Sequence, residues 1–343
     1  MALSIEDLHS IQLGAWPTPL RPNPTLGQVV GIPDLWIKRD DLTGFSWGGN
    51  KVRAVEYLIA DALRAGATEV VLAGGPSSNF AAVMAAAARS VGLGAHQVSY
   101  GSEPTDPVAA LIAARSVGAQ VHFTESPHRA EMETMATSLG RRRVEVGAVP
   151  YVVPRGGASD VGALGFIAAA IELDKQADET SDVPTTIVIP LGSGGSTAGL
   201  VAGLCCSHRN WKVHAVSVSR APEDIEEDIV NKSIRCAALA GVTLTSAAVT
   251  SCLNVHDGRN PGFGKLSAEQ ERFATEMSTK TGLLIDPTYN AKTLFWLRDA
   301  SLNTPILYWH TGGSLGALDF MLSSRRRSHR ESQQSTADTE SVR

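Results

Sequence analysis

The chain has 343 residues, a hydrophobic content of 43% and a formal net charge of −5, from 30 basic and 35 acidic side chains. This balance offers no positive field for a nucleic acid, and no run approaches the roughly 18 apolar residues of a membrane span. The four cysteines lack metal-ligand spacing. Because we find no secretory leader, we expect a cytoplasmic protein with reduced thiols, no metal and no membrane partner.

Strands and helices alternate along the first half of the chain. Short apolar runs predict strands at 69–73, 96–100, 120–123 and 151–153, and helices at 79–91, 107–117 and 128–139 lie between them. Strands separated by helices of this length favour a parallel sheet, because parallel neighbours need long crossover connections.

A second α/β block begins near Gly162. It has predicted strands at 185–190, 213–218 and 306–308, and predicted helices at 197–205, 221–240 and 268–281. We expect the early strand 35–39 to pair into this second sheet. The resulting prediction is an α/β fold of two domains: a large one from 1–50 and 163–323, and a small one from 51–162. The polar residues 324–343 are predicted to be a disordered tail.

Lys51 follows a glycine turn, Gly48-Gly49-Asn50. A lysine in this setting is either an ordinary surface residue at a helix start or a lysine that forms a Schiff base with a carbonyl group. The second role needs an unprotonated amine, and burial or nearby positive charge provides it.

A glycine-rich loop, Gly192-Ser193-Gly194-Gly195-Ser196, joins a predicted buried strand to a helix. Free backbone N–H groups and the helix dipole favour an anion there. No Lys-Ser/Thr pair follows, as a Walker loop requires, and the spacing of a dinucleotide fingerprint is absent. The sequence therefore indicates either a phosphate cradle or a tight turn without a ligand.

Ser77-Ser78-Asn79 opens the helix after the strand 69–73. A substrate carboxylate can bind at such a helix start, with the serine hydroxyl groups as donors. The alternative is simple capping by Ser78 or Asn79, and both roles are compatible.

A lysine after a glycine turn, a Ser-Asn helix start and a phosphate cradle together suggest pyridoxal phosphate. In this order they resemble the fold-type II pyridoxal-phosphate enzymes, in particular the group of D-cysteine desulfhydrase and 1-aminocyclopropane-1-carboxylate deaminase. The matching segments are 37–43, 48–51, 78–79, 154–157, 162–165, 192–199, 286–289 and 310–313. They span nearly the whole chain.

The resemblance implies a tryptophan synthase β-like fold with the cofactor in the cleft between the domains, and a homodimer. It implies that Lys51 forms the Schiff base, that Asn79 faces the 3-oxygen of the pyridoxal ring, and that Ser78 and Tyr289 are catalytic. Ser193, Gly194, Gly195 and Ser196 would hold the phosphate, and Asn290 and Thr311 would contact the cofactor. The expected substrate contacts are Ser77, Ser78, Phe80 and Phe263.

Five positions depart from the family pattern. The usual Gln-Ser-Asn-His reads Ser77-Ser78-Asn79-Phe80 here, and Ala54 replaces a lysine near the phosphate. Phe263 replaces the deaminase's second active-site tyrosine, and Asn290 replaces a glutamate or threonine near the pyridine nitrogen. An amide cannot keep that nitrogen protonated as a carboxylate does, so the cofactor would be a weaker electron sink.

These departures favour elimination over ring opening. We expect Lys51 to remove the α-proton of a small amino acid, the β substituent to leave, and hydrolysis to give pyruvate and ammonia. The cyclopropane substrate has no α-proton, and Phe263 and Asn290 remove two groups that its opening needs. A D-cysteine desulfhydrase-like lyase is therefore ranked above the deaminase. A β-replacement synthase and a non-catalytic cofactor-binding or amino-acid-binding protein stay open as alternatives.

Overall fold

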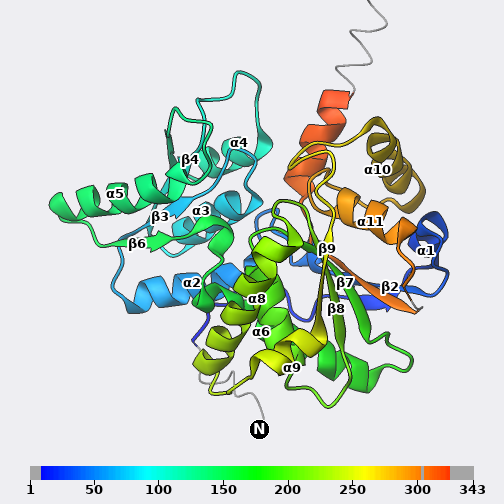
Figure 1. The fold of residues 1–343 in the computed structure, drawn as a ribbon. Helices are drawn as coiled ribbons and strands as arrows, with labels where there is room; N and C mark the ends of the chain where they lie inside the picture. The colour runs from blue at the N-terminus through cyan, green and yellow to red at the C-terminus, as the bar shows by residue number, and fades with distance from the viewer. Residues whose placement is uncertain (1–8, 303–304, 325–343) are drawn as a thin grey trace, which may run out of the picture.

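The computed structural model describes residues 9–302 and 305–324. Figure 1 shows two lobes, one carrying β3, β4 and β6 and the other carrying β2, β7, β8 and β9. Residues 314–324 are helical, so Ser324 belongs to a helix, and the rest of the predicted disordered tail lies outside the described residues.

Each lobe is built around its own sheet. The larger sheet has six strands in the order β1-β2-β10-β7-β8-β9, and its neighbours are parallel except for β1 and β2. Its strands are β1 (Leu20–Pro22), β2 (Leu35–Arg39), β7 (Thr186–Leu191), β8 (Lys212–Ser217), β9 (Leu253–Asp257) and β10 (Ile306–His310). The smaller sheet has four parallel strands in the order β5-β4-β3-β6. They are β3 (Glu69–Ala73), β4 (Gly94–Ser99), β5 (Gln120–Phe123) and β6 (Pro150–Val153).

Helices flank both sheets, which confirms the predicted fold class. The α-helices are α1 (Pro24–Val30), α2 (Lys51–Arg64), α3 (Asn79–Ser90), α4 (Ala109–Ser116), α5 (Glu131–Glu145), α6 (Asp160–Glu179), α7 (Gly195–Leu204), α8 (Pro222–Leu239), α9 (Ser246–Cys252), α10 (Ala268–Thr281) and α11 (Asn290–Asp299), with short 3-10 turns at η1 (Asp40–Leu42) and η2 (Arg155–Gly157). Within the described part of the chain, no helix is long and apolar enough to cross a membrane.

The predicted pairing of strand 35–39 with the second sheet is confirmed, because β2 lies beside β10 in parallel register. All four strands of the smaller sheet fall within 51–162, and all six strands of the larger sheet fall within 1–50 and 163–323. The domain boundaries themselves stay a prediction.

Both faces of each sheet are buried, and successive residues of the central strands pack into apolar clusters on opposite faces. In β7, Ile187 and Ile189 pack in one apolar cluster, whereas Val188, between them, packs in another on the opposite face. In β3, Val70 and Val71 divide in the same way. Successive strand residues point to opposite faces, so a parallel sheet covered on both sides needs a continuous apolar run. These runs carry the strand predictions.

Helix α6 has no counterpart among the predicted elements. It is buried along most of its first half, from Gly162 to Ala170, so it lacks the one-sided apolar stripe that signals a helix. Gly165 explains the tight packing, because a Cβ there would lie 2.0 Å from the carbonyl oxygen of Arg53 in α2. Gly199 of α7 meets the carbonyl of Ala163 equally closely. The backbone of α6 therefore touches both α2 and α7.

Candidate active site

A cavity of about 1230 Å³ is lined by residues that follow strands of both sheets. Its walls include Gly75, Tyr100, Gly192 and Thr311, which follow the carboxyl ends of β3, β4, β7 and β10. Loops at the carboxyl ends of parallel strands are the usual place for a ligand in open α/β sheets. The lining contains most of the predicted site residues, namely Lys51, Ser77, Ser78, Asn79, Phe80, Ser193, Gly194, Ser196, Phe263, Tyr289 and Thr311.

Lys51 is the first residue of α2 and lines the cavity. Burial lowers the pKa of its amine from 10.5 to about 8, and its Nζ has no hydrogen bond or ion pair with any described residue. The turn before it is fixed from two sides: the backbone N–H of Asn50 donates to the carbonyl of Thr311 at 3.0 Å, and the Asn50 amide donates to Ser196 Oγ at 3.1 Å. A lysine that binds a carbonyl group requires an amine without a partner and with a pKa near neutral pH.

The loop at the start of α7 is shaped to bind an anion. Gly194 has a φ of 92° and directly precedes the helix, which begins at Gly195, and no side chain caps the first turn. The first N–H groups of a helix have no intrahelical partner, so those of Gly195, Ser196 and Thr197 point outward with the positive end of the dipole. Together with the hydroxyl groups of Ser193 and Ser196, they form a cradle for a phosphate.

The Ser-Asn pair begins α3 at the other side of the cavity. Ser78 is the N-cap residue, and its Oγ accepts a hydrogen bond from the N–H of Ala81 at 3.2 Å. The side-chain amide of Asn79 has no hydrogen-bonding partner among the described residues, while Ser77 is exposed. Phe80 is buried and packs against Gly157. Capping and ligand binding are therefore both available at this helix start.

Tyr289 lies beside the phosphate cradle. A Cβ on Gly192 would come within 2.9 Å of the Tyr289 ring, and the ring of Phe263 meets Tyr289 edge-on with its centroid 6.2 Å away. Burial and the nearby Asp286 carboxylate raise the pKa of Tyr289 to about 12. The phenol therefore stays protonated at neutral pH.

The expected contact of Asn290 with the cofactor stays a prediction. Asn290 is fully buried and is absent from the cavity lining. Its amide donates to the carbonyl of Gly312 at 2.7 Å and to Asp286, and its Oδ1 accepts from the hydroxyl of Tyr308 at 2.6 Å. Thr311 is the neighbour that does line the cavity, and its Oγ1 lies 3.5 Å from Asn290 Oδ1. Asn290 thus supports the wall from behind.

The model of the pyridoxal-phosphate dependent enzyme family matches residues 11–312. The chain belongs to this family.

Relatives within this pyridoxal-phosphate dependent family carry two activities in their names. A putative 1-aminocyclopropane-1-carboxylate deaminase of Pyrococcus abyssi is 32% identical, over 90% of this chain and 93% of that protein. The mitochondrial bifunctional D-cysteine desulfhydrase/1-aminocyclopropane-1-carboxylate deaminase of Arabidopsis thaliana is 32% identical, over 91% and 80% respectively. A D-cysteine desulfhydrase of Salmonella schwarzengrund is 31% identical, over 89% and 94%.

Solved structures agree with the fold. The crystal structure of an ACC deaminase homologue superposes with a TM-score of 0.82 at 31% identity, covering 92% of this chain and 97% of that one. Maize serine racemase matches with a TM-score of 0.59 at 17% identity, covering 91% and 93%, which supports the fold alone. The two-sheet architecture is therefore that of the fold-type II pyridoxal-phosphate enzymes, as predicted.

The residues present fit pyridoxal phosphate, the family's cofactor. The uncapped first turn of α7 offers donors for the phosphate, Lys51 offers a free amine for the carbonyl carbon, and Asn79 offers an unpaired amide for a ring substituent. These groups match three different parts of one molecule, and all of them lie at one cavity. The roles of the individual residues remain proposals.

The lining also contains residues that were not predicted from the sequence, among them Tyr100 and Arg129. Tyr100 follows β4, and Arg129 lies in the loop between β5 and α5. Neither belongs to a recognisable motif. A usable signal is topological: both follow strands of a predicted parallel sheet, whose carboxyl ends must meet at one edge.

Proposed function

We propose that this protein is a pyridoxal-phosphate dependent lyase that removes the α-proton of a small amino acid and eliminates its β substituent, as a D-cysteine desulfhydrase does. The observation that carries the proposal is the half-buried, unpaired amine of Lys51, whose pKa desolvation lowers to about 8. It faces the same cavity as the anion cradle at α7. Relatives named for D-cysteine desulfhydrase activity, 31% identical over most of the chain, support it.

Residues of this chain can bind the substrate, remove its α-proton and protonate the leaving group. When bound, pyridoxal phosphate withdraws electrons from the α-carbon of the amino acid. The start of α3, with Ser78, binds the substrate carboxylate, and Lys51 accepts the α-proton. Tyr289, protonated at neutral pH, donates a proton to the departing β substituent. The substituent leaves with the electron pair of its bond to the β-carbon, and water converts the unsaturated product to pyruvate and ammonia.

Phe263 favours elimination over opening of a cyclopropane ring. Its ring lies edge-on to Tyr289 and has no hydroxyl group to offer as a second acid or nucleophile. Asn290 contributes less to this ranking than the sequence suggested, because it supports Thr311 instead of lining the cavity. The 1-aminocyclopropane-1-carboxylate deaminase activity named for several relatives is the second candidate.

A screen of D- and L-amino acids and of 1-aminocyclopropane-1-carboxylate, with release of α-keto acid and ammonia as readouts, tests the proposal. Faster turnover of D-cysteine or a β-substituted D-alanine supports it, and faster turnover of the cyclopropane acid reverses the ranking. New β-substituted amino acids in the presence of added thiols would indicate a replacement synthase. Cofactor absorbance without any turnover would indicate a binding protein.

We also propose that the protein is cytoplasmic, as the sequence predicts, and a homodimer, as the family resemblance implies. Light scattering coupled to gel filtration measures the mass in solution directly. A mass of one chain, 36.2 kDa, would contradict the dimer. Cell fractionation with antibody detection tests the location.

A further inference from the structure

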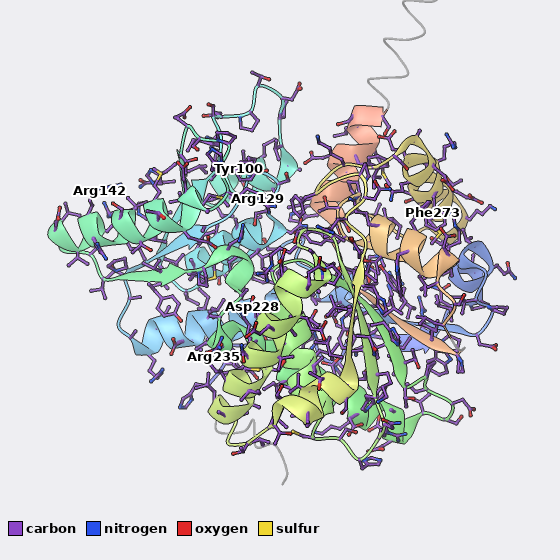
Figure 2. All side chains as sticks on the ribbon, in the orientation of Figure 1. Tyr100, Arg129, Arg142, Asp228, Arg235 and Phe273 are labelled. Atoms are coloured by element: carbon purple, nitrogen blue, oxygen red, sulfur yellow. The ribbon has the colours of Figure 1, made fainter. Side chains whose placement is uncertain are left out.

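Arg129 carries a guanidinium group that no described residue neutralises. Its Cζ lies 4.2 Å from the centroid of the Phe263 ring and 5.9 Å from that of Tyr100, and its buried Nε has no hydrogen-bonding partner. No ion pair or hydrogen bond joins its side chain to any residue that the structure describes. Figure 2 shows Tyr100 and Arg129 on the lobe that carries β4 and α5.

The two other arginines on the same cavity do have partners. Arg155 Nε lies 3.6 Å from Glu133, and Arg220 pairs with Asp228 at 2.9 Å. An unsatisfied buried donor is costly, and contact with aromatic faces offsets that cost only in part. The remaining N–H donors of Arg129 are therefore available to an anion inside the cavity. The planar guanidinium matches a carboxylate or sulfonate in particular, because it can donate two parallel hydrogen bonds.

The position of Arg129 separates it from the two anion sites already described. The phosphate cradle belongs to the larger sheet, after β7, while Arg129 comes from the loop after β5 on the smaller sheet. The start of α3, at Ser78, follows β3, and β4 lies between β3 and β5. Strands in a sheet are spaced by about 4.8 Å, so the two loops begin roughly 10 Å apart. The extended arginine side chain shortens this separation.

Arg129 is also close to the proposed proton donor. The Phe263 ring contacts both Arg129 and Tyr289, and the Arg129 charge acts to lower the pKa of Tyr289. A group bound to Arg129 would therefore lie near the β substituent of the substrate and away from its α-carboxylate.

We propose that Arg129 binds an anionic group on the substrate side chain, so that the preferred substrates are α-amino acids whose β leaving group is anionic, a sulfonate or a thiolate. This inference rests on the proposed function, because it names the substrate class of the same site. This contact also explains why a phenylalanine can stand where the deaminase has a tyrosine: the apolar ring of Phe263 packs against the Arg129 guanidinium.

The experiment measures equilibrium binding to the holoenzyme with amino acids that lack an α-proton and cannot react. α-Methylaspartate represents an anionic side chain and α-methylserine a neutral one, and each enantiomer is titrated against the absorbance of the bound cofactor. Arg129→Met keeps the apolar stem over Phe263 and removes the charge. Its affinity for α-methylaspartate should fall roughly 10- to 100-fold, while its affinity for α-methylserine should change less than about 3-fold. Arg220→Met removes a paired cation from the same cavity and should lower neither affinity comparably.

Several outcomes overturn the proposal. Equal loss for both ligands would mean that Arg129 binds the α-carboxylate, and weaker retention of pyridoxal phosphate alone would assign Arg129 to the phosphate. No change in either affinity would leave it a packing role. If the Met variant does not fold, Arg129→Gln is held to the same criterion. Failure of the unmodified holoenzyme to bind either ligand or to turn over any amino acid would instead refute the proposed function.

Discussion

Arg53, two residues after the proposed cofactor-binding Lys51, forms a buried ion pair with Asp40 through two contacts of 2.8 Å. Burial alone would raise the pKa of Asp40, but the Arg53 guanidinium holds it below its ordinary value. Arg53 also reaches Glu172 of α6 at 3.0 Å and lies 4.1 Å from the centroid of the Trp16 ring. The pair fastens the start of α2, and therefore Lys51, to the larger lobe.

Replacing Arg53 by methionine should destabilise the protein by about 3–5 kcal/mol, because it leaves buried carboxylates without their partner. Arg235→Met is the matched control: Arg235 pairs with Asp160 at 2.8 Å but is half exposed on α8 (Figure 2). Loss of this surface pair should cost about 0–1 kcal/mol. Urea unfolding followed by circular dichroism measures both values, and equal costs would contradict the importance of the buried pair.

Borohydride reduction of the holoenzyme should attach the pyridoxyl group to Lys51, because its amine has no partner and its pKa of about 8 is near neutral pH. Peptide mass spectrometry locates the modified residue. Lys51→Ala should abolish the attachment. Lys265→Ala removes another lysine from the cavity lining and should leave the attachment unaffected. A pyridoxyl mass on any other lysine would make the assignment wrong.

Gly194→Ala should weaken binding of pyridoxal phosphate by roughly 10-fold or more, because the φ of 92° at the start of α7 aims the cradle and a side chain there strains it. Gly241→Ala introduces similar backbone strain at a φ of 76° without touching the cavity. It should reduce stability alone. Fluorescence titration of the apoprotein with the cofactor measures the affinities, and equal dissociation constants for the parent and Gly194→Ala would refute the cradle.

The rate at which the apoprotein captures pyridoxal phosphate should depend on pH through Lys51. Burial lowers the pKa of its amine to about 8, and only the neutral amine attacks a carbonyl. The rate constant should therefore rise about tenfold per pH unit below pH 8 and level off above it. Nα-acetyl-lysine in solution, which keeps its side-chain amine, provides the comparison, and its rate constant should continue to rise towards about pH 10. A protein profile that follows the free lysine would contradict the buried amine.

Tyr289→Phe should slow turnover by roughly 10²-fold or more if its hydroxyl transfers a proton, with little effect on cofactor affinity. The ring contacts with Gly192 and Phe263 survive this change. Single-turnover kinetics separate the chemical step from binding. A loss of only a few-fold would assign Tyr289 a packing role.

The parts of the site that are local in sequence could be predicted, and the parts that depend on long-range contacts could not. The glycine loop, the Ser-Asn helix start and the turn before Lys51 each lie at a strand–helix or turn–helix junction, which apolar runs and glycines reveal. Asn290 is different, because its partners Tyr308 and Gly312 follow it by about twenty residues. Only the three-dimensional structure shows that these partners occupy its side-chain amide.

Arg129 escaped prediction for a related reason. A single arginine in a polar loop normally faces solvent, and nothing in residues 124–130 distinguishes it. Its importance comes from Phe263, which lies in the loop after β9 of the other lobe. Helix α6 was missed because burial on most sides erased its amphipathic pattern.

The close contacts of α6 have a consequence for the geometry of the site. Gly165 seats α2 on α6, and Gly199 seats α7 on the same helix, with backbone atoms nearly touching. Lys51 at the start of α2 and the phosphate cradle at the start of α7 therefore share one rigid mount. The reach from the lysine to the phosphate loop is therefore set by backbone packing against one helix, and a larger residue at Gly165 or Gly199 would change it.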